Sequence, residues 1–129
     1  MTVFESIGVA LSTYSAIPVP QFPWTEKNTR YAICCFPVVG FFCAGALLLW
    51  NLLCQYLNVS SVLFAAVAVC LPLLITGGIH MDGFMDTMDA MASWKTRERR
   101  LEILKDSHTG AFAVIGCTAY LLIATGVMC

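Results

Sequence analysis

Three aspartates recur at helical spacing near the middle of the chain. They are Asp82, Asp86 and Asp89, and the intervals i, i+4 and i+7 place all three on one face of an α-helix. Carboxylates this close repel one another unless a cation lies between them. Because these oxygen ligands come without accompanying Cys or paired His, the pattern favours a hard divalent ion, Mg2+ or Mn2+, over zinc.

A magnesium ion held by carboxylates usually takes its other ligands from water and from a substrate phosphate. We therefore expect a phosphate-handling site at Asp82, Asp86 and Asp89, in which Asp89 binds the metal or acts as the general base. An exposed acidic helix face is the alternative. The metal interpretation is favoured because residues 31–81 contain no charged side chain, and ionisable groups beside such an apolar run are commonly functional.

His80 lies just before these aspartates and is a second candidate for catalysis. On an ideal helix it lies about 200 degrees around the axis from Asp82, so it needs a bend near Gly78 to reach the same site. A catalytic role and a structural hydrogen bond both remain open for His80, and the same holds for His108.

The composition indicates an integral membrane protein. The chain has 129 residues, of which 59% are hydrophobic and 12% are charged, and its net charge is -1. This balance argues against a nucleic-acid-binding protein. The seven cysteines lack C-x-x-C spacing and lie mostly in apolar runs, so we expect packing residues and no zinc site or disulfide framework.

The first 24 residues predict a short helix and then a loop. Apolar residues recur at helical spacing over residues 3–17, which indicates an amphipathic helix that lies in the membrane interface or packs against the bundle. Pro18, Pro20 and Pro23 follow within a few positions, and they cannot continue that helix.

Three later apolar runs, residues 31–53, 62–79 and 111–129, are long enough to cross a membrane. A polar and aromatic turn separates the first two runs, and Gly77 and Gly78 loosen the end of the second. The turn contains Trp50, Asn51, Gln55, Tyr56 and Asn58. We expect an all-α polytopic membrane helix bundle with about three transmembrane helices, an N-terminal amphipathic helix and a cytoplasmic amphipathic helix.

Residues 93–107 hold most of the positive charge. Five of the seven Lys and Arg residues lie there, which makes this loop cytoplasmic under the positive-inside rule. Apolar residues around Leu101 predict a short surface helix within the loop. The cations either anchor the topology or bind phosphate, and the pattern leaves both open. They are Lys95, Arg97, Arg99, Arg100 and Lys105.

Residues 105–110 end this loop directly before the third apolar run. A lysine, a hydroxyl and a glycine at the start of a helix can form an anion cradle, although Ser107 or Thr109 can equally cap the helix. The candidate substrate-binding residues are Arg100, Lys105, Asp106 and Ser107.

Residues 77–89, GGIHMDGFMDTMD, resemble the G-x-H-x-D-G-x-x-D-T-x-D signature of the cobalamin synthase family, adenosylcobinamide-GDP ribazoletransferase. Three further stretches agree with that family in order and spacing. They are residues 17–20 (IPVP), 36–40 (FPVVG) and 99–107 (RRLEILKDS). The resemblance covers essentially the whole chain but only about half of a family member, so we expect residues 1–129 to form a single membrane domain from the N-terminal part of a longer fold.

The chain departs from the family pattern at a few positions. Ala90 and Ala113 stand where Gly is frequent, and His108 stands where Arg is common. The resemblance implies a Mg2+-dependent transferase that joins alpha-ribazole, or its 5'-phosphate, to adenosylcobinamide-GDP and releases GMP at the last step of cobalamin biosynthesis. It also implies a bacterial cytoplasmic (inner) membrane location with the active-site loop in the cytoplasm, and it leaves a homo-oligomer open.

Two alternatives remain at this point. The clustered aspartates also suit another membrane transferase, of the CDP-alcohol phosphotransferase or prenyltransferase type, although the Ala-Arg that follows the first Asp-Gly in the former is absent here. A non-enzymatic subunit with a cation path lined by Asp82, Asp86 and Asp89 belongs to a different class. The nearby basic loop suits a phosphate substrate better.

Overall fold

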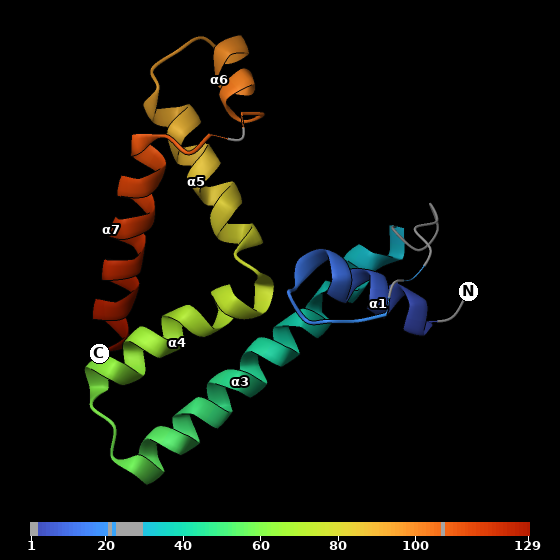
Figure 1. The fold of residues 1–129 in the computed structure, drawn as a ribbon, viewed down its shortest axis with the longest axis vertical. Coiled ribbons are helices and arrows are strands. Elements are labelled where there is room, and N and C mark those ends of the chain that lie inside the picture. Colours follow the sequence, from blue (N-terminus) through green and yellow to red (C-terminus); the bar gives the residue numbers. More distant parts are fainter. Residues whose placement is uncertain (1–2, 21, 23–29, 107) are drawn as a thin grey trace. The chain divides into compact units, whose positions relative to one another are not determined.

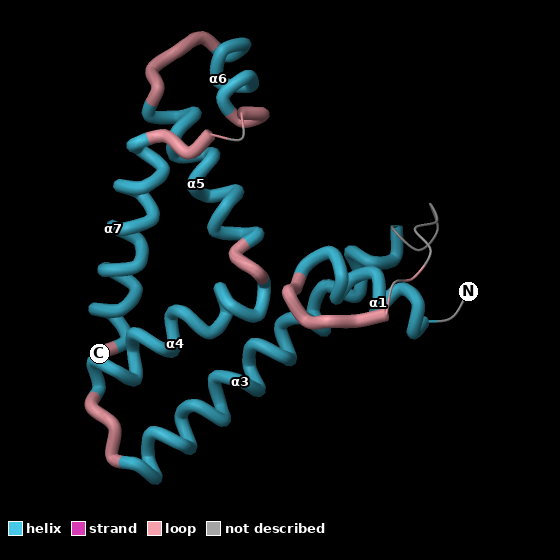
Figure 2. The backbone as a smooth tube through the Cα atoms, viewed as in Figure 1, coloured by secondary structure: helices cyan, strands magenta, loops and turns pink. Residues whose placement is uncertain are grey.

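The computed structural model describes residues 3–20, 22, 30–106 and 108–129, and all regular structure within these residues is helical (Figures 1 and 2). The all-α prediction is thereby confirmed. The elements are α1 (Val3–Tyr14), the 3-10 turn η1 (Ile33–Cys35), α3 (Phe36–Leu57), α4 (Ser61–Thr76), α5 (Ile79–Ala92), α6 (Arg97–Ile103) and α7 (Ala111–Met128).

Contacts divide the chain into two compact units, residues 1–79 and residues 80–129. The first unit contains α1, α3 and α4, and the second contains nearly all of α5 together with α6 and α7. The boundary therefore falls where the apolar half of the chain gives way to the aspartates. The expected single membrane domain over residues 1–129 stays a prediction.

Two stretches in the described part of the chain are long and apolar enough to cross a membrane, namely Arg30–Leu57 and Ala111–Met128. The helices α4 and α5 meet the same criterion only together, as a broken span or a re-entrant pair, which brings the total to as many as three. This agrees with the predicted number. The second span needs a correction, because its helix ends at Thr76 and not at Ile79.

The amphipathic helix at the start of the chain is confirmed as α1. It ends at Tyr14, earlier than the expected Ile17. Pro18 disfavours helical backbone only at Ile17, the residue before it. The segment that follows is held by backbone pairing, since the Ala16 N–H donates to the Ile75 carbonyl at 2.8 Å. This bond attaches the end of α1 to the end of α4.

A small apolar core lies where α1 packs against the start of the long helix. Val9, Ala10 and Ala32 are its buried members, and the rings of Tyr14 and Phe36 meet edge to face with their centroids 5.2 Å apart. Beyond this core, large apolar side chains point outward along the spans, as expected for surfaces that face lipid. Examples are Phe41, Leu49, Ile123 and Val127.

A short turn joins α3 to α4, but it begins later than predicted, because α3 continues to Leu57 and not to residue 53. Of the five residues predicted for the turn, only Asn58 lies in it, and the other four belong to α3. Asn58 takes a left-handed backbone conformation, with φ of 52°, and so ends α3, and the Ser60 side chain caps the start of α4. Nearby, the Trp50 indole N–H donates to the Phe64 carbonyl at 3.1 Å. The two helices form a hairpin (Figure 1).

The predicted loosening at two glycines is also confirmed. Gly77 and Gly78 have φ values of +64° and +74°, which side chains rarely adopt. The Gly78 N–H donates to the Leu73 carbonyl at 2.8 Å, and this bond closes the last turn of α4. The backbone then enters a new helix that carries all three predicted metal ligands.

Candidate functional site

The helix α5 carries the three aspartates as predicted. It is continuous from Ile79 to Ala92, so Asp82, Asp86 and Asp89 share one helical face. Asp82 is exposed, whereas Asp86 and Asp89 are half-buried. His80 is exposed in the first turn of α5 and interacts with another group of the protein.

Asp89 differs from the other two aspartates because it binds the backbone of another helix. Its Oδ2 accepts a hydrogen bond from the Gly110 N–H at 2.5 Å, and its Oδ1 accepts one from the Ala113 N–H at 3.0 Å. Gly110 is the N-cap residue of α7, and it has no side chain that could cap the helix. A carboxylate from α5 therefore caps α7.

The same two helices approach closely on either side of this cap. An added Cβ on Gly110 would lie 2.1 Å from Asp89 Oδ2, and one on the buried Gly116 would lie 2.9 Å from Met88 Cγ. The rings of Phe84 and Tyr120 stand with their centroids 5.8 Å apart. Glycines thus allow α7 to lie against α5.

The described residues contain no group of three or more His, Cys, Asp or Glu side chains that could hold a metal ion. The aspartates lie along one face, but their oxygens do not converge. Within the same part of the chain, no hydrogen bond or ion pair engages the carboxylates of Asp82 and Asp86. Two such carboxylates one turn apart suit Mg2+, which commonly keeps several waters and completes its shell with a substrate phosphate.

The predicted surface helix in the basic loop is confirmed as α6. Arg99 forms an ion pair with Glu102 on this helix. Arg100 is half-buried, and its Nε is buried without a hydrogen-bond partner in the part of the chain that the structure describes. Because a buried donor without a partner costs free energy, Arg100 is suited to receive an anionic ligand. Lys105 is exposed.

The side chains of Asp106 and His108 form a hydrogen bond just before α7. His108 Nδ1 lies 2.6 Å from Asp106 Oδ1, and the His108 backbone N–H donates to the same oxygen at 3.1 Å. The hydrogen bond between the two side chains lowers the pKa of Asp106 and raises the pKa of His108. Ser107 lies outside the described residues.

The predicted anion cradle at the start of α7 has a different arrangement. The N-cap position belongs to Gly110, so Thr109 does not cap the helix, and the backbone amides of Gly110 and Ala113 bind Asp89. Phosphate binding by Lys105 and its neighbours stays a prediction. The sequence did not predict the hydrogen bonds between Asp89 and α7. One feature of the sequence points to them, namely that Gly110 stands directly before an apolar helix and has no side chain that could cap it.

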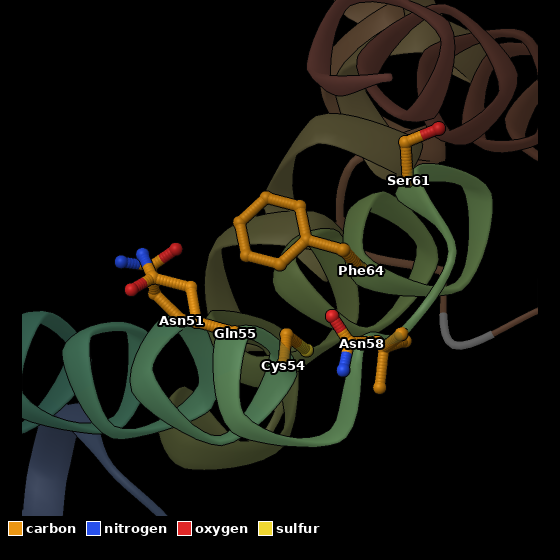
Figure 3. Close-up of a pocket in the computed structure, with 7 residues that line it drawn as sticks. Asn51, Cys54, Gln55, Asn58, Ser61 and Phe64 are labelled. Carbon is orange, nitrogen blue, oxygen red and sulfur yellow. The ribbon is translucent and has the colours of Figure 1, made fainter.

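The first unit contains a pocket that the sequence did not predict. It lies at the turn between α3 and α4, where Phe64 extends from α4 toward the amide side chains of α3 (Figure 3). Its lining mixes polar and apolar side chains and carries no charged residue, so it does not suit a diphosphate. The lining residues are Asn51, Cys54, Gln55, Asn58, Val59, Ser61 and Phe64.

The cobalamin-5-phosphate synthase family model matches residues 6–129. The chain belongs to this family. Similar relatives are named adenosylcobinamide-GDP ribazoletransferase. One, from Lachnoclostridium phytofermentans, is 46% identical over 128 residues, which cover 99% of this chain and 49% of the relative. Another, from Clostridium botulinum strain Eklund 17B, is 39% identical over 124 residues, which cover 96% and 49%. No solved structure matches the chain.

Membership in the cobalamin-5-phosphate synthase family confirms the resemblance seen in the aspartate-rich motif. The relatives in this comparison carry the name of a ribazoletransferase, and the structure of this chain contains candidate membrane helices. The alternatives of another transferase type and of a cation-path subunit find no support in these matches. The chain spans about half the length of the curated relatives that it matches.

Proposed function

We propose that this chain forms part of an adenosylcobinamide-GDP ribazoletransferase, which joins alpha-ribazole or its 5'-phosphate to adenosylcobinamide-GDP and releases GMP. The observation that carries the proposal is the family match over residues 6–129, which includes the aspartate-rich helix. The relatives that bear this name are about twice as long as this chain.

The reaction requires an exchange of bonds at phosphorus, a base that takes a proton, and groups that hold the diphosphate. The hydroxyl of alpha-ribazole attacks the phosphorus that bears cobinamide, a new P–O bond forms, and the P–O bond to GMP breaks. The hydroxyl proton must pass to a base, and GMP carries away the electron pair of the broken bond. Positioning of the diphosphate and neutralisation of its charge supply most of the catalysis in phosphoryl transfers of this kind.

We assign the metal site to Asp82 and Asp86. Their carboxylates lie one turn apart on α5, and both remain outside the hydrogen bonds that engage Asp89. When bound, Mg2+ neutralises charge on the diphosphate. These two side chains would hold the ion, and a site with two protein carboxylates suits an ion that also binds substrate phosphate.

The basic loop would supply the remaining groups that bind phosphate. Arg100 offers a buried Nε that lacks a protein partner in the described residues, and the exposed Lys105 adds a second positive charge. Of the two predicted proton acceptors, Asp89 is bound to α7, so we assign the role to His80. The positive charge of this loop supports a location on the cytoplasmic side of a bacterial inner membrane.

The experiment measures GMP release from adenosylcobinamide-GDP and alpha-ribazole in membranes that contain this chain or a full-length relative. In whichever protein is active, we expect Mg2+ to be required. Asp86→Asn should lower the rate about a hundredfold or more, because a metal ion supplies several kcal/mol of charge stabilisation.

The matched control for this experiment is Glu98→Gln, which removes an exposed acidic side chain from α6 and should leave the rate unchanged. Full activity of Asp86→Asn would contradict the metal site. A lack of GMP release from both proteins in the presence of Mg2+ would contradict the proposed reaction.

A further inference from the structure

The contact between Asp89 and α7 has the pattern of a complete helix cap. In an ordinary cap, the side chain of the N-cap residue accepts the N–H three residues later, and a second acidic side chain accepts the N–H of the N-cap residue itself. Here Asp89 accepts both N–H groups, those of Ala113 and Gly110. One carboxylate from another helix does the work of two local side chains.

The charge of Asp89 also has a partner that is not a metal. The start of a helix carries partial positive charge, because its first N–H groups have no carbonyl partners within the helix. The carboxylate of Asp89 lies against those groups and is half-buried there. Its negative charge is therefore compensated by α7, whereas Asp82 and Asp86 have no such compensation among the described residues.

We propose that Asp89 is a positioning residue that fixes the start of α7 to α5, and that it is neither a metal ligand nor the general base. Through Gly110 it also fixes the end of the loop that carries Lys105 to the helix that carries Asp86. The structural part of this inference stands by itself. Only its consequence for the reaction rests on the proposed function.

The lack of a side chain at Gly110 makes room for this contact. A Cβ at this position would lie 2.1 Å from Asp89 Oδ2, so a side chain there would have to displace the carboxylate. Gly110→Ala should therefore displace Asp89 from α7 without altering any carboxylate. This variant separates the effect of losing the cap from the effect of losing an acidic side chain.

The first test measures hydrogen exchange at the backbone amides of Gly110 and Ala113 in the full chain in detergent. Asp89→Ala should lower the protection of both amides about five- to thirtyfold, the range expected for loss of a cap. Asp89→Asn should keep only part of the protection, because its side chain has one acceptor oxygen in place of two and its Nδ2 cannot accept from an N–H. Gly110→Ala should lower the protection of Ala113. Asp86→Asn is the matched control, one turn earlier on α5, and should change neither amide.

The second test measures activity in the protein that releases GMP. A metal ligand or a general base loses its function when Asp becomes Asn, whereas this cap loses one of its two hydrogen bonds. We therefore expect Asp89→Asn to keep a rate within about tenfold of the parent and an unchanged Mg2+ requirement. Asp89→Ala and Gly110→Ala should both raise KM for adenosylcobinamide-GDP, because both release the loop.

Two results would overturn the inference. One is unchanged amide protection in Asp89→Ala, which would show that α7 does not depend on this carboxylate. The other is an Asp89→Asn variant that is as inactive as Asp86→Asn and needs more Mg2+. If no protein releases GMP, the proposed function fails, while the exchange measurement still decides whether Asp89 caps α7.

Discussion

The two compact units hold their helices together in different ways. In the first unit, α3 and α4 form a hairpin from a sequence without charged residues, and the Trp50 indole donates to a backbone carbonyl of the neighbouring helix. In the second unit, the Asp89 carboxylate accepts from backbone amides of α7, and Gly116 allows close packing against Met88. One contact uses a neutral donor, and the other uses a charged acceptor.

The difference shows how position along the chain decides which polar bond is available. A carbonyl within a membrane helix can accept a second hydrogen bond, and a neutral donor suits it because no charge enters the apolar region. The first amides of a helix lack internal partners and carry partial positive charge, so a carboxylate suits them. The charged contact therefore lies at the start of α7, where an apolar span meets the polar loop.

The largest expected effect on stability comes from the tight contact in the second unit. Gly116→Ala would place a Cβ 2.9 Å from Met88 Cγ, so we expect a loss of about 1–3 kcal/mol from overpacking. Gly126 on the same helix has open space around it, and Gly126→Ala should be neutral or stabilising by up to about 1 kcal/mol. Unfolding of both variants in detergent, followed by circular dichroism, tests the contrast. Equal stabilities would show that α7 does not pack on α5 at Gly116.

A smaller effect is expected from the neutral contact in the first unit. Trp50→Phe removes the donor to the Phe64 carbonyl and should cost about 0.5–1.5 kcal/mol, since this is the usual net value of one hydrogen bond. The same unfolding measurement applies. Trp94→Phe serves as the control because Trp94 is exposed, and it should change nothing. If Trp50→Phe is as stable as Trp94→Phe, the indole hydrogen bond does not stabilise the contact between α3 and α4.

The smallest effect concerns the exposed pair before α7. Because the pKa of His108 is raised, its contribution is fully present below the ordinary value of 6.5 and is lost as the pH rises through the raised pKa. Because the pKa of Asp106 is lowered, its contribution is present above the ordinary 3.8 and is lost as the pH falls through the lowered pKa. The pair is therefore strongest between these two ordinary values.

Asp106→Asn provides the test of this pair. It should lower the pKa of His108 toward 6.5, as followed by NMR titration of the imidazole. An unaltered titration would show that the two side chains do not interact. Such a result would leave the Asp89 cap as the charged contact that defines this end of α7.

Much of the fold could be predicted because its signals are local. Apolar runs predicted the spans, helical spacing predicted α1 and α5, and the paired glycines predicted the break after α4. The errors lie at helix ends, as with Tyr14 in place of Ile17. There the backbone of Ala16 bonds to a distant helix, which no periodicity reveals.

The candidate site was harder to predict because it depends on pairing between distant residues. Helical spacing correctly placed the three aspartates on one face of α5, but it could not show that Asp89 binds amides 21 and 24 residues further along. The resemblance named the family that the comparisons confirm. The individual roles of Asp82, Asp86, His80 and Arg100 remain predictions.

The glycine at position 110 has a practical consequence for protein engineering. Designers often stabilise a helix by placing Ser, Thr, Asp or Asn at its N-cap, where such residues are usually favourable. At Gly110 that gain would be offset, because a side chain there would have to displace the Asp89 carboxylate that already accepts the Gly110 N–H. A consensus-based redesign of this protein should therefore leave the position as glycine, and a library that randomises it should enrich the parent residue.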